Sequence, residues 1–170
     1  MLDEATPGLR FPRGARERFG LQPDMITYGK SVGGGLPLAA LLVSRQAYTA
    51  AVQTAGTMVA HPLILGAACS FLRAHRTFDH SRLEALTSRL TRALNLLPGL
   101  RAGHEGSIFQ VDVPGLARDP NGRIPAMEHA LLRHGVFVVT ASFYFLSEPF
   151  DAAAVDDVAR RWGLAMAGCT

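Results

Sequence analysis

Apolar residues in the second half of the chain recur at spacings that predict alternating helices and strands. A helix is expected over 81–97, because its leucines repeat every three or four positions and Pro98-Gly99 ends the pattern. Further patterns predict a strand over 107–113, a helix over 126–134 that Gly135 ends, a strand over 136–139 and a helix over 152–162 that Asp151 caps. This order predicts a small α+β domain.

The first half has a different pattern, with short apolar runs between glycine-rich loops. Residues 39–43 are expected to form a buried strand and residues 63–75 a helix that Pro62 begins, and both are expected in the core. Met1 and Leu2 have the character of a strand end, and His61 is expected to be a buried structural residue beside Pro62. The change of pattern places a boundary near residue 77, which gives domains 1–77 and 78–170.

The composition is that of a globular chain of 170 residues, with 48% hydrophobic and 18% charged residues. The net charge is +3, but the arginines are dispersed, so no nucleic-acid partner is expected. The two cysteines and six histidines show neither disulfide nor metal-ligand spacing, so we expect no metal and a reducing, cytoplasmic location. No segment resembles a signal peptide or a membrane span, so no membrane contact is expected.

Lysine occurs once in the chain, as Lys30, whereas the sixteen other basic residues are arginine. Arginine serves ion pairs and phosphate contacts at least as well, but a primary amine can lose its proton near neutral pH and can condense with an aldehyde. Position 30 is therefore a candidate for chemistry that needs an amine. The alternative is a codon bias that removed lysines and left one on the surface.

Asp3, at the end of the first expected strand, supplies a carboxylate that could act with this amine. Pyridoxal 5′-phosphate chemistry needs both groups: a lysine holds the aldehyde as an imine, and a carboxylate keeps the pyridine nitrogen protonated. Gly29 and the glycines at 33–35 allow close approach of the backbone to a ring, although glycine runs are often plain loops. A nucleotide-binding P-loop is not favoured, because its pattern requires glycine where the chain has Asp24.

Four segments, in order, resemble the motifs of a known family. Residues 3–10 are similar to D-E-V-x-T-G-F-R, residues 23–30 to P-D-x-x-x-x-G-K, residues 33–37 to G-G-G-x-P, and residues 56–62 to G-T-x-x-x-[NH]-P. On these motifs the chain resembles the C-terminal half of class III pyridoxal-phosphate aminotransferases, a family that includes the glutamate-1-semialdehyde 2,1-aminomutases. In the second half, residues 106–109 resemble the family's G-S-x-F strand.

The resemblance implies an α/β fold, the C-terminal part of a fold-type I pyridoxal-phosphate-dependent transferase. Residues 1–77 would then belong to the large cofactor domain and residues 78–170 to the small domain. Lys30 would anchor the cofactor and act as the base, Asp3 would bind the ring nitrogen, and Gly56 and Thr57 would bind the phosphate, in this family usually across a homodimer interface. The implied activity is transfer of an amino group between small molecules, or its internal movement as in an aminomutase.

The resemblance also implies a missing part, because the family has a long N-terminal portion that precedes Asp3. That portion supplies the phosphate-binding loop, the aromatic residue on the ring and the strands beside Met1 and Leu2. If the chain is part of an enzyme, an N-terminal half is therefore expected, either encoded separately or lost by a wrongly chosen start at Met1. The chain alone is expected to be poorly soluble. Departures from the family pattern at Pro7, Leu9 and Ala39 add to the alternative that the chain is a non-catalytic remnant.

Overall fold

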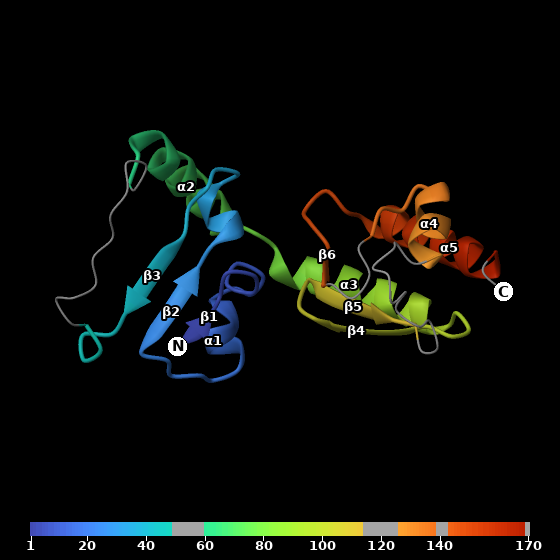
Figure 1. The fold of residues 1–170 in the computed structure, drawn as a ribbon, viewed down its shortest axis with the longest axis horizontal. Helices are drawn as coiled ribbons and strands as arrows, with labels where there is room; N and C mark the ends of the chain where they lie inside the picture. Colours follow the sequence, from blue (N-terminus) through green and yellow to red (C-terminus); the bar gives the residue numbers. More distant parts are fainter. Residues whose placement is uncertain (49–59, 114–125, 139–142, 169–170) are drawn as a thin grey trace. The chain divides into compact units, whose positions relative to one another are not determined.

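The structure, a computed structural model, describes residues 1–48, 60–113, 126–138 and 143–168. The chain divides into two compact units, Met1–Asp79 and His80–Thr170 (Figure 1). The boundary expected near residue 77 lies close to this division.

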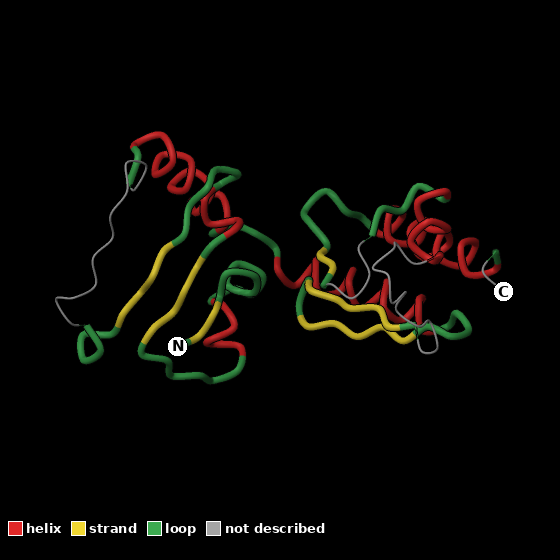
Figure 2. The backbone as a smooth tube through the Cα atoms, in the orientation of Figure 1, coloured by secondary structure: helices red, strands yellow, loops and turns green. Residues whose placement is uncertain are grey.

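The first unit is built on a three-stranded sheet with the order β1-β2-β3 (Figure 2). Strand β1 (Leu2–Asp3) runs parallel to β2 (Met25–Tyr28), and β3 (Ala40–Val43) runs antiparallel to β2. The short helix α1 (Gly14–Arg18) lies between β1 and β2 in the sequence. The 3-10 helix η1 (Lys30–Gly33) follows β2 and packs against α2 (Pro62–His75).

The strand and helix expected in the core of this half are present, but the expectation of burial is wrong. Leu41 and Leu42 of β3 are 46% and 51% exposed, and in α2 only Ile64 and Ala68 are buried. His61 is also exposed, and it begins α2 by accepting a hydrogen bond on Nδ1 from the N–H of Leu63 at 3.2 Å. Within the described residues these apolar faces have little cover, which sequence periodicity cannot reveal.

Gly34 joins η1 to α2 through a close backbone contact. Its φ is +59°, and a Cβ at this position would lie 2.8 Å from the carbonyl oxygen of Ala67 and 3.1 Å from Cβ of Phe71. Only glycine meets both the conformational and the steric requirement. The next residue, Gly35, has a φ of +94° but no atom within 4 Å of such a Cβ.

The second unit packs helices on one face of an antiparallel sheet, as expected for an α+β domain (Figure 1). Its strands are β4 (Arg101–Glu105), β5 (Ile108–Asp112) and β6 (Tyr144–Phe145), in that order. Helix α3 (His80–Asn95) packs on β4 and on α5 (Ala152–Ala167), which also contacts α4 (Ala126–Arg133). The buried core includes Leu83, Leu90 and Leu94 of α3 with Val155 and Trp162 of α5.

Most of the elements predicted for this unit are confirmed, including the N-cap at Asp151, which accepts a hydrogen bond from the N–H of Ala154 at 2.8 Å. The strand expected over 136–139 is wrong for 136–138, which are not in a strand, and 139 lies outside the described residues. The strand β6 pairs with β5 in its place, and β4 was missed because its sequence does not alternate apolar and polar residues. None of the described helices is long and apolar enough to cross a membrane.

We predict that Gly34→Ala destabilises the packing of η1 on α2 by about 2 kcal/mol or more, through strain at positive φ plus overlap with Ala67. Gly35→Ala is the matched control, because it carries the strain of about 1 kcal/mol without the overlap. Amide hydrogen exchange in α2 measures the difference. Equal loss of protection in the two variants would contradict the proposed contact.

Candidate active site

Asp3 is placed by the parallel pairing of β1 with β2. It lies opposite Thr27 in the register, and the next residue, Glu4, donates its backbone N–H to the carbonyl of Thr27 at 2.8 Å. The Asp3 Oδ1 atom accepts two hydrogen bonds of 2.8 Å, from the N–H of Ala5 and from the hydroxyl of Thr27. The carboxylate is therefore fixed at the end of the strand, although its side chain is exposed.

The hydrogen bonds to Asp3 favour its charged form. The pKa of Asp3 lies below its usual value, chiefly because the N–H of Ala5 donates to the carboxylate, then because the Thr27 hydroxyl does so. Desolvation raises this pKa by less than either hydrogen bond lowers it, and the positive charge of Lys30 has the smallest effect, which is to lower it. Asp3 is therefore ionised at neutral pH, as a partner of a protonated ring nitrogen must be.

Lys30 is the first residue of η1, and its backbone has a φ of +51°, in the left-handed region that non-glycine residues seldom adopt. The side chain is exposed, and Nζ donates a hydrogen bond to the hydroxyl oxygen of Thr6. Thr6 belongs to the turn that follows Asp3. The fold thus brings the two residues singled out in the sequence, Asp3 and Lys30, to the same end of the sheet.

The sequence did not single out Thr6 or Thr27 as part of this cluster. Both fall at positions that the resembling motifs leave open, so only strand register and loop geometry reveal them. The two residues expected at the phosphate, Gly56 and Thr57, lie outside the described residues.

Glu4 shapes the loop behind the cluster. Its side chain is 1% exposed, and its carboxylate accepts hydrogen bonds from the backbone N–H groups of Ala15 at 2.9 Å and Arg16 at 2.7 Å. Gly14, with a φ of +79°, leaves room for this carboxylate, because a Cβ there would lie 2.9 Å from both of its oxygens. Glu4 thereby ties the start of α1 to the end of β1.

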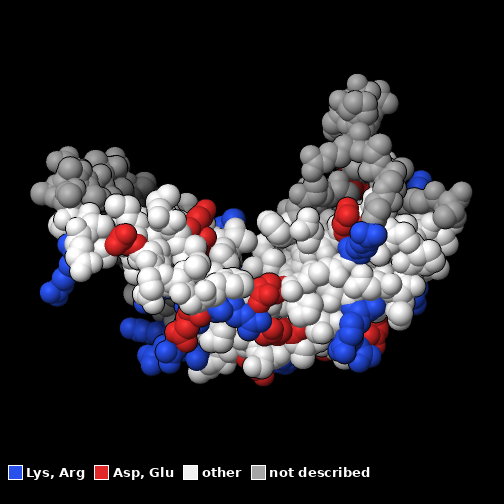
Figure 3. Space-filling model, turned by 90° about the horizontal axis from the view of Figure 1, so that it is seen from below, with Lys and Arg blue, Asp and Glu red and all other residues white. Residues whose placement is uncertain are grey.

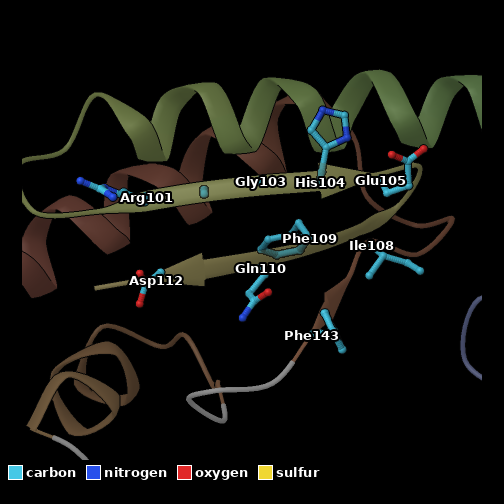
Figure 4. A pocket seen from close by; sticks show the side chains of 10 residues that line it. Arg101, Gly103, His104, Glu105, Ile108, Phe109, Gln110, Asp112 and Phe143 are labelled. Carbon is cyan, nitrogen blue, oxygen red and sulfur yellow. The ribbon is translucent and has the colours of Figure 1, made fainter. Parts of the chain in front are cut away.

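A separate hollow of about 460 Å³ lies on the sheet of the second unit (Figure 4). Its lining includes Arg101, Glu105, Gln110 and Asp112 from β4 and β5, together with Phe143. None of the residues expected to carry chemistry lines it, so it does not add to the cluster around Lys30. On the face of the chain drawn in Figure 3, basic side chains lie beside acidic ones rather than in a continuous basic area.

Comparisons with known proteins relate this chain to one group of enzymes, although no family model matches it. The chain is 32% identical to glutamate-1-semialdehyde 2,1-aminomutase from Anaeromyxobacter sp. (strain K) over 94% of its own length and 41% of that protein. A second relative, glutamate-1-semialdehyde 2,1-aminomutase 1 from Cenarchaeum symbiosum (strain A), is 31% identical over 86% of this chain and 40% of that protein.

Solved structures agree with these relatives. The FumI protein of Sphingopyxis sp. MTA144, described in a pyridoxal-phosphate internal aldimine form, superposes with a TM-score of 0.84 at 25% identity over 98% of this chain and 42% of that chain. The chain belongs to the class III pyridoxal-phosphate-dependent aminotransferase family. It corresponds to the C-terminal half of these relatives and spans about two fifths of their length. An omega-transaminase from Sphaerobacter thermophilus, at 21% identity and a TM-score of 0.82, shows the same fold.

The described residues fit the cofactor of this family in their chemistry. An ionised carboxylate and a primary amine lie at one end of the sheet, and the amine is exposed. Both groups are held by hydroxyl partners rather than by each other in an ion pair of the described structure. These are the two kinds of group that a ring nitrogen and an aldehyde would require.

We predict that Thr27→Val raises the pKa of Asp3 toward its ordinary value, because the carboxylate loses a hydroxyl donor. Thr27→Ser keeps the donor and is expected to keep the pKa low. A pH titration of the Asp3 carboxyl carbon by NMR, assigned with Asp3→Asn, measures both variants. The pKa of Asp3 is lower in the folded chain than in the unfolded chain, where it is about 3.9. Any stability that the Asp3 carboxylate contributes is therefore present above the unfolded pKa and is lost as the pH falls through the folded pKa. Identical titrations in the valine and serine variants would contradict a role for the hydroxyl.

We predict that Glu4→Gln destabilises the start of α1 by about 1–3 kcal/mol, because an amide replaces one of the two acceptor oxygens with a donor. The control is Glu17→Gln, which removes an exposed pair with Arg13 at 3.4 Å and is expected to change stability by less than about 0.5 kcal/mol. Amide exchange at Ala15 and Arg16 reports the loss. Unchanged protection in Glu4→Gln would show that the buried carboxylate does not hold the helix.

Proposed function

We propose that the chain is the lysine-bearing part of a pyridoxal-phosphate-dependent aminotransferase or 2,1-aminomutase. The observation that supports this most directly is that an ionised Asp3 and the sole lysine of the sequence lie at the same end of the sheet. The family relationship gives this pair its chemical meaning.

When bound, pyridoxal 5′-phosphate supplies an aldehyde that takes up amines and a ring that withdraws electrons. The Lys30 amine would hold the cofactor at its aldehyde carbon and would also serve to move a proton at the substrate carbon. Asp3 would hold the proton on the ring nitrogen. Gly56 and Thr57 would bind the phosphate, a role carried over from the resembling motif.

The proposed enzyme includes more polypeptide than this chain. Within the described residues β1 has no strand on its other side, and Leu41, Leu42 and Leu63 are 46%, 51% and 69% exposed. Parallel sheets are normally covered on both faces, so these surfaces support an N-terminal half as partner. We further propose that the complete enzyme is a homodimer that acts on a small-molecule amino donor and acceptor.

A non-catalytic remnant is the second candidate. The exposed apolar residues of the first unit are compatible with it as well. It is favoured by the departures from the family pattern at Pro7, Leu9 and Ala39. The two candidates differ in one measurable property, the reactivity of Lys30 toward the cofactor.

We predict that pyridoxal phosphate followed by borohydride labels Lys30 at close to one equivalent once the N-terminal half is present. Peptide mass mapping locates the label, and the single lysine leaves only the amine of Met1 as a competitor. Lys30→Arg is the matched control, because it keeps the charge but cannot condense with an aldehyde.

Each outcome decides between the candidates. Labelling of Lys30 without the added half means that the chain forms the pocket alone, and labelling only with it means a divided enzyme. Label that stays absent or equal at Met1 and Lys30 in the complemented protein would support the remnant instead.

A further inference from the structure

We propose that Thr6 is a positioning residue for the Lys30 amine. The turn that the Asp3 side chain closes places Thr6 beside this amine. The contact itself depends on this chain alone, whereas its catalytic meaning rests on the proposed function. No motif assigns a role to Thr6, which stands at the open position of the D-E-V-x-T-G-F-R pattern.

The turn holds Thr6 in place from both sides. Before it, the Asp3 side chain accepts the N–H of Ala5 at 2.8 Å, which is an Asx turn. After it, the N–H of Gly8 donates to the carbonyl of Glu4 at 3.0 Å. Gly8 leaves no room for a side chain, because a Cβ there would lie 2.6 Å from both the Glu4 carbonyl oxygen and the Tyr28 ring. The backbone position of Thr6 is thus set by the turn.

Thr6 is also the one residue of 5–9 whose side chain can accept a hydrogen bond, since its neighbours are alanine, proline, glycine and leucine. The family pattern places a threonine one position later, where this chain has Pro7. The hydroxyl of this turn is therefore at position 6, where it reaches Nζ of Lys30.

An exposed lysine needs such a contact if its amine is to stay in one place. Its four-carbon side chain samples many rotamers in water, so holding it in one rotamer costs conformational entropy. The backbone of Lys30 is fixed in the left-handed region, and the Thr6 hydroxyl holds the far end of the side chain. A preoriented amine reacts faster with a bound aldehyde than one that searches.

Asp3 consequently has two separable roles. Its charge suits a ring nitrogen, and its Oδ1 atom closes the turn that carries Thr6. Asp3→Asn keeps an acceptor oxygen for the turn but removes the charge, whereas Asp3→Ala removes both.

The test begins without cofactor, so that it remains informative even if the proposed function fails. Reductive methylation of the full chain with ¹³C-formaldehyde labels two amines, Lys30 and Met1, and the N-dimethyl group keeps one N–H for Thr6. We expect the Lys30 methyl signal to differ from that of the unfolded chain, to collapse toward it in Thr6→Val, and to be restored in Thr6→Ser. The Met1 signal is the internal reference, and unchanged amide exchange in α1 shows that the fold is intact.

The second measurement is the rate of pyridoxal-phosphate labelling at Lys30 in the complemented protein. We expect Thr6→Val to slow it about fivefold, with Thr6→Ser near the original rate. Asp3→Asn is expected to retain the cofactor-free methyl signal, and Asp3→Ala to lose it.

The inference is overturned if the Lys30 signal is the same in Thr6→Val as in the unmodified chain, or if serine fails to restore it. Altered methyl signals with no pyridoxal-phosphate labelling in any variant would uphold the contact and reject the catalytic function.

Discussion

The parallel pairing of β1 with β2 determines the positions of Asp3 and Thr27 and brings the turn of Thr6 close to Lys30. Two paired residues are enough: Leu2 lies opposite Ile26, and Asp3 opposite Thr27. This register gives Asp3 its hydroxyl donor and starts the turn that carries Thr6 to Lys30. A shift of one residue would turn the carboxylate to the other face of the sheet, away from Thr27. The site therefore depends on a strand pair that is too short to be stable without surrounding structure.

That surrounding structure is incomplete in the first unit. Its sheet has a parallel pair, which proteins normally bury on both faces, yet Leu41 and Leu42 of β3 are about half exposed. The second unit contrasts with it, because its helices cover one face of an antiparallel sheet, where an open second face is ordinary. The unit that contains Asp3 and Lys30 is thus the one whose apolar surface is left exposed by the described residues.

The sequence predicted those parts of the structure that local pattern and tertiary packing both favour. The long helices α3 and α5 have apolar stripes that match their buried faces, and their prediction is confirmed. Strands β2, β4 and β6 were not predicted, because they have two to five residues and no clear alternation. Asp3 and Lys30 could be found because their residue types are chemically unusual where they stand. Thr6 and Thr27 could not, because hydroxyl residues are common in turns and strands and only the register shows which of them touch.

The backbone conformations of Gly14, Gly34 and Lys30 differ in whether folding alone explains them. Gly34 is required by its contact with α2, and Gly14 by the buried Glu4, so folding alone accounts for these glycines. Lys30 is different. It adopts a positive φ that costs about 1 kcal/mol for a residue with a Cβ, where glycine would be free of strain, and the residue is exposed. Strain without a packing benefit is typical of functional positions. The conformation of Lys30, more than the glycine-rich motif around it, therefore favours a catalytic origin for this chain.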